Sequence, residues 1–169
     1  TVTWSPTTAL STTASPATPS SLATALDSAT ISYSVTNAGA TGCAVNSSTA
    51  VLTFTTAGSC IVRASAQATS NYAAATRDVT FVISLATRTL AIDSGSYTSS
   101  YTMLATPPTL TSTASAGGGT KSYASSTAGV CTVNSGSGLV AFVSAGTCTI
   151  TASITADATY ASVNSSSIS

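Results

Sequence analysis

The sequence contains no histidine and no glutamate, and its charged side chains are only four Lys or Arg and four Asp residues. General acid–base catalysis needs a group whose pKa can be brought near the working pH, usually a histidine or a pair of carboxylates. The formal net charge is zero, so the chain offers no basic surface to nucleic acid or to anionic lipid. These absences predict a protein that is not an enzyme, uses no cofactor and binds no nucleic acid.

Long hydrophobic runs are also missing, although the mean hydropathy is +0.40. The most apolar stretch, Val79–Ala86, is short and is interrupted by Thr80 and Ser84. A membrane-spanning helix needs about 20 apolar residues, so we expect a buried strand here and no membrane insertion. The chain begins at Thr1 without a methionine, which we interpret as a mature or excised piece.

What the sequence has in abundance is small hydroxyl side chains, with 34 Thr and 32 Ser residues. Serine and threonine compete with helical hydrogen bonds through their own side chains, and the strong helix formers are nearly absent. Short runs of β-branched and aromatic residues alternate with small polar ones, as in Ile31, Tyr33 and Val35. The composition therefore predicts an all-β protein.

The sequence repeats itself with an offset of 88 residues. Cys43 aligns with Cys131 and Cys60 with Cys148, and the separation of 17 positions from one cysteine to the next is the same in both halves, without a gap. An internal repeat of this length indicates tandem copies of one structural unit. We predict two immunoglobulin-like β-sandwich domains, at residues 1–86 and 87–169.

The second copy is shorter than the first. Two complete repeats would need 176 residues, and the sequence has 169. The positions without a counterpart match the end of the apolar stretch Val79–Ile83, of which only Ser167–Ser169 remains in the second copy. We expect the last strand of the second domain to be truncated or to be supplied by a neighbouring molecule.

The expected strands follow the turn residues that bound each apolar run. They lie at 1–4, 20–26, 30–37, 43–46, 50–55, 59–66 and 77–85 in the first repeat, and at 88–92, 109–114, 121–125, 130–134, 138–143, 147–154 and near 166–169 in the second.

The four cysteines permit three pairing schemes. Symmetry between the repeats favours Cys43 with Cys60 and Cys131 with Cys148, one disulfide in each domain. The alternatives are buried free thiols or a metal site, but two cysteines per repeat without histidine fall short of a tetrahedral ligand set, so no metal is expected.

The spacing Gly58-x-Cys60-x-Val62-x-Ala64, with its echo around Cys148, resembles the bacterial immunoglobulin-like (Big-type) tandem repeats of large secreted surface and adhesin proteins. The resemblance covers nearly the whole chain. It implies an extracellular location and a stalk, adhesin or fibre role, and it implies no catalytic residues.

Some residues remain candidates for other roles. Trp4, Tyr97 and Tyr101 lie outside the repeated positions, so they could contact a glycan or pack on neighbouring structure. The recurring Tyr72 and Tyr160 are expected in the core or as corner tyrosines bonded to backbone. Asp78 and Asp93 flank the expected domain boundary and could hold calcium, although isolated aspartates are usually turn residues.

Two functions remain open at this stage. The first is a structural module, a stalk or a building block of a fibre or filament, that contacts copies of itself or adjacent repeats through strand edges. The alternative is an adhesin-type module that recognises a glycan or a host protein.

Overall fold

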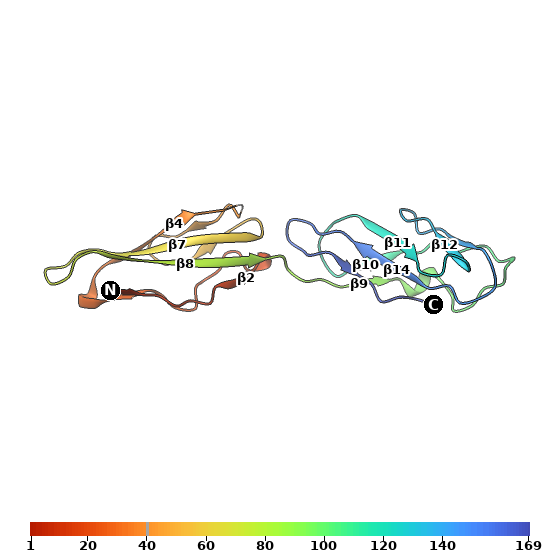
Figure 1. The fold of residues 1–169 in the computed structure, drawn as a ribbon, viewed down its shortest axis with the longest axis horizontal. Helices are drawn as coiled ribbons and strands as arrows, with labels where there is room; N and C mark the ends of the chain where they lie inside the picture. The colour runs from red at the N-terminus through yellow and green to blue at the C-terminus, as the bar shows by residue number, and fades with distance from the viewer. Residues whose placement is uncertain (40) are drawn as a thin grey trace. The chain divides into compact units, whose positions relative to one another are not determined.

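The computed structural model describes residues 1–39 and 41–169, and it divides the chain into two compact units, Thr1–Ala86 and Thr87–Ser169 (Figure 1). Strands build both units, and the described residues form no α-helix, only the short 3-10 turns Thr12–Ala14, Leu26–Ser28 and Ser94–Ser96. The predicted fold class, two tandem immunoglobulin-like sandwiches with one disulfide each, is confirmed.

The first unit is built around a four-stranded sheet. The described residues of this unit form the strands β1 (Val2–Thr3), β2 (Ala9–Ser11), β3 (Thr24–Ala25), β4 (Ile31–Asn37), β5 (Ala44–Val45), β6 (Leu52–Thr53), β7 (Gly58–Ala66) and β8 (Ala75–Ser84). The large sheet has the order β2-β8-β7-β4, while β1 pairs with β3 and β5 with β6. The pairing of β2 with β8 is parallel, and the other pairs are antiparallel.

The core of the first unit follows from alternation along β7. Cys60, Val62 and Ala64 are fully buried, because alternate side chains of a strand face the same side of the sheet. Against this face lies Trp4, whose ring centroid is 5.2 Å from that of Tyr33 and 5.8 Å from that of Phe81. The disulfide between Cys43 and Cys60 joins the segment that precedes β5 to the large sheet.

The second unit repeats this plan with fewer pairings. Its strands are β9 (Leu90–Ile92), β10 (Ser112–Ala114), β11 (Lys121–Ser125), β12 (Cys131–Val133), β13 (Val140–Phe142), β14 (Ile150–Ile154) and β15 (Val163–Asn164). The main sheet has only the order β11-β14-β15, and β9 pairs with β10 and β12 with β13. The second disulfide joins Cys131 of β12 to Cys148, two residues before β14.

The expected strands need one addition and two corrections. Sequence patterning missed β2, because Ala9–Ser11 is paired only through the distant Val82–Ser84. The strand expected at 147–154 begins only at Ile150, and the strand expected near 166–169 is β15 at Val163–Asn164 with one further bridge at Ile168. In each case the position of the partner strand, rather than local composition, determines which residues form the strand.

A buried arginine ties the loops of the second unit together. The Arg88 side chain is fully buried and donates hydrogen bonds to the backbone carbonyls of Ala161, Ala116, Gly118 and Thr155. Its guanidinium also lies 3.2 Å from the Asp157 carboxylate. The sequence predicts no role for this residue, since one arginine in a loop carries no periodic signal.

Candidate functional site: an apolar groove in the second unit

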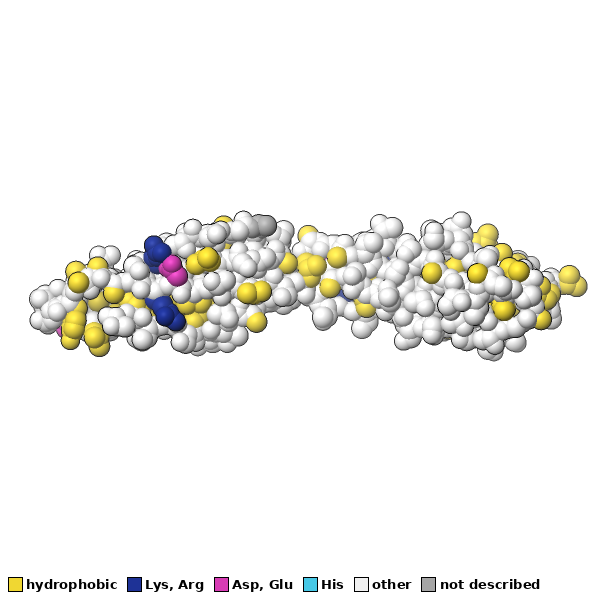
Figure 2. Space-filling view, viewed as in Figure 1, with side chains coloured by type: hydrophobic (Ala, Val, Ile, Leu, Met, Phe, Trp, Pro, Cys, Tyr) yellow, Lys and Arg dark blue, Asp and Glu magenta, His cyan; other side chains and the backbone are white. Residues whose placement is uncertain are grey.

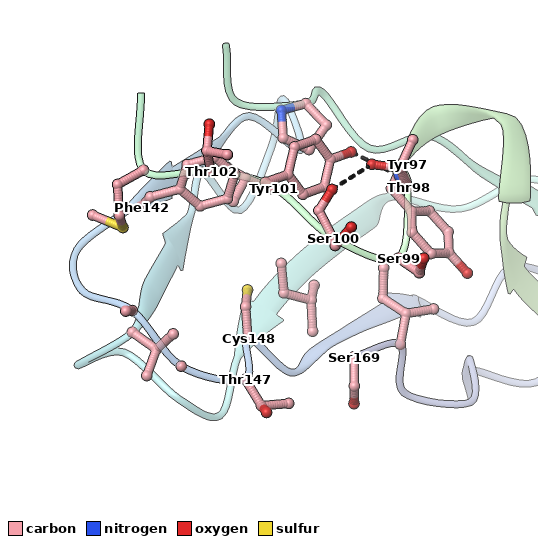
Figure 3. A pocket seen from close by; sticks show the side chains of 18 of the residues that line it. Tyr97, Thr98, Ser99, Ser100, Tyr101, Thr102, Phe142, Thr147, Cys148 and Ser169 are labelled. Carbon is pink, nitrogen blue, oxygen red and sulfur yellow. Dashed lines mark hydrogen bonds between the residues drawn. The ribbon is translucent and has the colours of Figure 1, made fainter. Parts of the chain in front are cut away.

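A cavity within the second unit has a volume of about 470 Å³. Figure 3 shows Tyr97, Tyr101 and Phe142 along one side of this groove and Cys148 and Ser169 on the other. Leu110, Val140 and Ile150, which belong to the core of this unit, form part of its wall. The groove therefore opens directly onto the hydrophobic core.

Local bonds hold the segment that carries the tyrosines. The Tyr101 hydroxyl accepts a hydrogen bond from the Thr98 backbone N–H at 2.7 Å, and the Thr98 hydroxyl donates to the Ser100 carbonyl at 3.0 Å (Figure 3). The Tyr101 ring packs on Phe142 with centroids 5.3 Å apart. These contacts hold the rings of Tyr101 and Phe142 along one side of the groove, although the segment that carries Tyr101 belongs to no strand.

The structure separates the three aromatic residues that the sequence singled out. Tyr97 and Tyr101 both border the groove, as partly exposed rings. Trp4 lies in the core of the first unit, only 3% exposed, and its indole N–H donates to the Ser21 carbonyl at 2.9 Å. Trp4 is therefore a packing residue, and a ligand could reach only the two tyrosines.

The expectation for the recurring tyrosines is wrong for Tyr72, which is 48% exposed. The buried tyrosines are instead Tyr33 and Tyr123. The Tyr33 hydroxyl accepts from the Ala23 backbone N–H at 2.9 Å, and the Tyr123 hydroxyl is 3.0 Å from that of Ser112. Their position in the alternating strands β4 and β11 was the available signal, since period two places them on the core face.

The groove differs from the same region of the first unit. There, Phe81 and Ile83 of β8 fill the corresponding space and are 3% and 2% exposed. Cys60 is accordingly fully buried, whereas its counterpart Cys148 is half-buried and lines the groove. The sequence does not predict a groove at this position.

The charged residues make contacts within each unit; on the face that Figure 2 shows, the main blue and magenta areas lie close together on the first unit. Asp78 forms a two-point ion pair with Arg63, and the hydrogen bonds from that guanidinium lower the pKa of Asp78. A hydrogen bond from the Thr111 hydroxyl is the main cause that lowers the pKa of Asp93. Both aspartates thus hold strands or turns together.

Asp157 closes a turn of the second unit. Its carboxylate accepts from the backbone N–H groups of Tyr160 and Thr159 at 2.7 and 2.8 Å, and these bonds lower its pKa, helped by the Gly118 N–H and the charge of Arg88. Within residues 1–39 and 41–169, no three Cys or Asp side chains cluster as metal ligands would. Over the same residues, no helix is long and apolar enough to cross a membrane.

The comparisons with known proteins are distant. No family model and no curated protein matches the sequence. Among solved structures, mouse cadherin-23 EC22-24 is 16% identical with a TM-score of 0.34 and is aligned over 85% of this chain and 55% of its own. The C-terminal 282-residue fragment of intimin, in complex with the intimin-binding domain of the translocated intimin receptor, is 19% identical with a TM-score of 0.33, over 79% and 50%.

Human protocadherin-24 EC1-2 is also similar, at 10% identity and a TM-score of 0.36, over 87% of this chain and 82% of its own. The present chain spans about half the length of the cadherin-23 and intimin chains.

Proposed function

We propose that the chain is a structural module of a Big-type extracellular bacterial surface protein, serving as a load-bearing stalk or as a building block of a fibre, without catalysis. The observation that carries the proposal is the parallel pairing of β2 with β8, at Ala9 with Val82, Leu10 with Ile83 and Ser11 with Ser84 (Figure 1). Two further features, the disulfides and the use of the charged residues, agree with it.

The parallel pairing determines how the first unit resists a force that pulls its two ends apart. Force that enters through Thr1 draws β2 towards its own N-terminus, and force that leaves through Ala86 draws β8 towards its C-terminus. Because the two strands are parallel, these opposite forces shear them past each other, and all three paired positions bear the force at the same time. In an antiparallel pair the same two forces would act at one end of the pair, and the paired positions would separate one after another.

The disulfides limit how far each unit can extend. The bonds Cys43–Cys60 and Cys131–Cys148 each enclose a separation of 17 residues, which cannot lengthen while the bond is intact. Disulfides persist in oxidising surroundings outside the cytosol, which supports the proposed extracellular location. Each closed loop also stabilises its domain by roughly 3 kcal/mol in the chain-entropy model.

The charged residues support the same role, because their contacts are internal ones. Arg63 bonds to Asp78, Arg88 to Asp157, and Asp93 to Thr111. Asn71 donates to Asp27 at 3.2 Å. In a catalytic or ion-binding protein such side chains would face a ligand. Here they bond to other residues of the same unit and hold strands and turns together.

Single-molecule stretching of the chain from its two ends tests the proposal. Under oxidising conditions each unit should unfold in one sharp step. The paired variant Cys43→Ser, Cys60→Ser should lengthen the step of the first unit by about 60 Å, since 17 residues at ~3.6 Å each are released. A Leu10→Pro variant, which removes a donor and distorts β2, is the control for shear and should lower the unfolding force.

Unfolding of the intact chain at forces no higher than those of the Leu10→Pro variant would contradict a load-bearing role. A step length that does not change on removing the disulfide would show that the loop is already open.

The alternative function is adhesin-type recognition of a glycan or a host protein. The observation that favours it is the groove with Tyr97 and Tyr101 at its border, since partly exposed aromatic rings on a polar surface suit sugar stacking. A glycan array and a pull-down with the 169-residue chain distinguish the two. Binding that the double variant Tyr97→Ser, Tyr101→Ser abolishes would support recognition over a purely structural role.

A further inference from the structure

Arg88 lies at the point where tension from the first unit enters the second. The first unit ends at Ala86 and the second begins at Thr87, so the backbone of Thr87 carries any force between them. Arg88 follows at once, two residues before β9 begins at Leu90. A contact of the Arg88 side chain therefore takes up tension before the pairing of β9 with β10 does.

The Arg88 side chain joins this entry point to the loop that leads into β15. Its Nε donates a hydrogen bond to the Ala161 carbonyl at 3.0 Å, and its Nη2 donates to the Thr155 carbonyl. Thr155 directly follows β14, and Ala161 lies two residues before β15. One hydrogen bond thus bridges a separation of 73 residues in the sequence.

This bridge gives tension a short route through the second unit. Force that enters at Thr87 and leaves beyond β15 can pass through the guanidinium from Arg88 to Ala161. While these bonds hold, strands β9 to β14 and the disulfide Cys131–Cys148, which lie between the two residues in the sequence, bear less of the force.

The bonds of Arg88 suit an anchor because they are buried and act together. The side chain is fully buried, so water does not replace a partner as a bond lengthens. The guanidinium also donates to the carbonyls of Ala116 and Gly118 and lies 3.2 Å from the Asp157 carboxylate. Hydrogen bonds from a charged donor are about twice as strong as neutral ones.

The loop before β11 fits closely around the guanidinium. Gly117 has a φ of +75°, and an added Cβ would lie 2.6 Å from an Asp157 carboxylate oxygen and 3.0 Å from an Nη of Arg88. The Tyr160 ring also lies over the guanidinium, with its centroid 5.9 Å from the central carbon. Arg88 therefore cannot leave its site unless the surrounding loops open.

We propose that Arg88 is the mechanical anchor of the second unit. Its buried guanidinium takes the tension that enters at Thr87 and passes it to the backbone of Thr155 and Ala161, and unfolding under force begins when these bonds break. The anchor rests on the function proposed above, since it matters only in a chain under tension. It differs from a general contribution to stability because it states which contacts break first.

Stretching of the 169-residue chain at constant force tests the anchor. All chains carry Cys43→Ser and Cys60→Ser, which lengthen the step of the first unit by about 60 Å and so identify the step of the second. Arg88→Lys retains the charge and the apolar stem but loses the planar set of donors. The lifetime of the second unit should fall about 100-fold or more, because at least two charge-assisted bonds are lost and each contributes about tenfold to the rate.

A second variant leaves Arg88 in place. Gly117→Ala displaces the loop from the guanidinium and should shorten the lifetime of the second unit about 10-fold, through the loss of one bond. It also provides the measurement if the Arg88→Lys chain shows no folded second unit. Neither substitution should change the lifetime of the first unit.

Gly138→Ala is the matched control. Gly138 lies between β12 and β13, and an added Cβ would lie 2.3 Å from the Leu110 carbonyl oxygen, so the substitution destabilises the second unit without touching the anchor. A region that is still folded in the transition state has little influence on the unfolding rate. Gly138→Ala should therefore lower the melting temperature of the second unit but change its lifetime under force by less than about 3-fold.

Three results would overturn the anchor. The first is a lifetime of the second unit within about 3-fold of the original in the Arg88→Lys or Gly117→Ala chain while the first unit resists force, and the proposed function would then stand without the anchor. The second is an equal loss of lifetime in the Arg88→Lys and Gly138→Ala chains, which would reduce Arg88 to a general stabiliser. The third is unfolding of both units at negligible force, which would contradict the proposed function and the anchor together.

Discussion

Replacing Arg88 by methionine should destabilise the second unit and leave the first unchanged. The methionine keeps an unbranched apolar stem but removes every donor of the guanidinium. Four backbone carbonyls, those of Ala161, Ala116, Gly118 and Thr155, then lose their hydrogen bonds. Asp157 also loses its nearby positive charge.

The size of the effect follows from burial. The Arg88 side chain is fully buried, and removing one partner from a buried network of this kind costs about 3–5 kcal/mol. A domain of this size is stable by only about 4–12 kcal/mol. At roughly 4 °C or more per kcal/mol, the melting temperature of the second unit should fall by about 12 °C or more.

The assay uses the single tryptophan. Trp4 lies in the core of the first unit, so its fluorescence follows the unfolding of that unit alone, while far-UV circular dichroism follows both. The Arg88→Met chain should show an unchanged fluorescence transition and an early loss of part of the dichroism signal. Arg63→Met is the matched control, because the Arg63 side chain is 42% exposed and its ion pair should contribute little.

A fall of less than about 2 °C in the dichroism transition would refute the role assigned to Arg88. An equal shift of the tryptophan transition would refute the separation of the two cores.

Three further predictions concern single features. The double substitution Cys43→Ser, Cys60→Ser should destabilise the first unit by roughly 3 kcal/mol in urea titrations followed by Trp4 fluorescence, and leave the second unit unaffected. The lowered pKa of Asp157 means that its carboxylate stabilises the second unit above the ordinary aspartate pKa of about 3.9; this stabilisation should disappear as the pH falls through the lower folded value, and Asp157→Asn should flatten that part of the pH profile. Gly138→Ala should lower the melting temperature of the second unit, because Gly138 has a φ of +75° and an added Cβ would lie 2.3 Å from the Leu110 carbonyl oxygen, whereas Gly129→Ala, where a Cβ meets nothing within 4 Å, should not.

The all-β class and most of the strands were predictable, because they depend on alternation and composition. Ile31–Asn37 and Lys121–Ser125 alternate with period two, and both were expected within a residue of where they lie. The pairing of Cys43 with Cys60 followed from the equal spacing of the repeats, since equivalent positions occupy equivalent places in each unit.

The sites were less predictable. Trp4 and Tyr101 are both aromatics outside the repeated positions, yet one is in a core and the other borders a groove. Trp4 packs against Tyr33 and Phe81 inside the core, whereas Tyr101 packs on Phe142 at the border of the groove. Arg88 gave no local signal, because its five partners are brought together only when Ala116–Gly118 and Thr155–Ala161 fold over it.

The sequence by itself determined the repeat, the strand-forming composition and the cysteine spacing, because these are properties of residue order. Only the tertiary structure decided that a groove lies in the second unit. The groove depends on how Tyr97–Thr102 and Gly146–Ile150 pack around the space, and packing between segments distant in the chain is not encoded in local pattern. The outcome is a groove of about 470 Å³ bordered by these two segments.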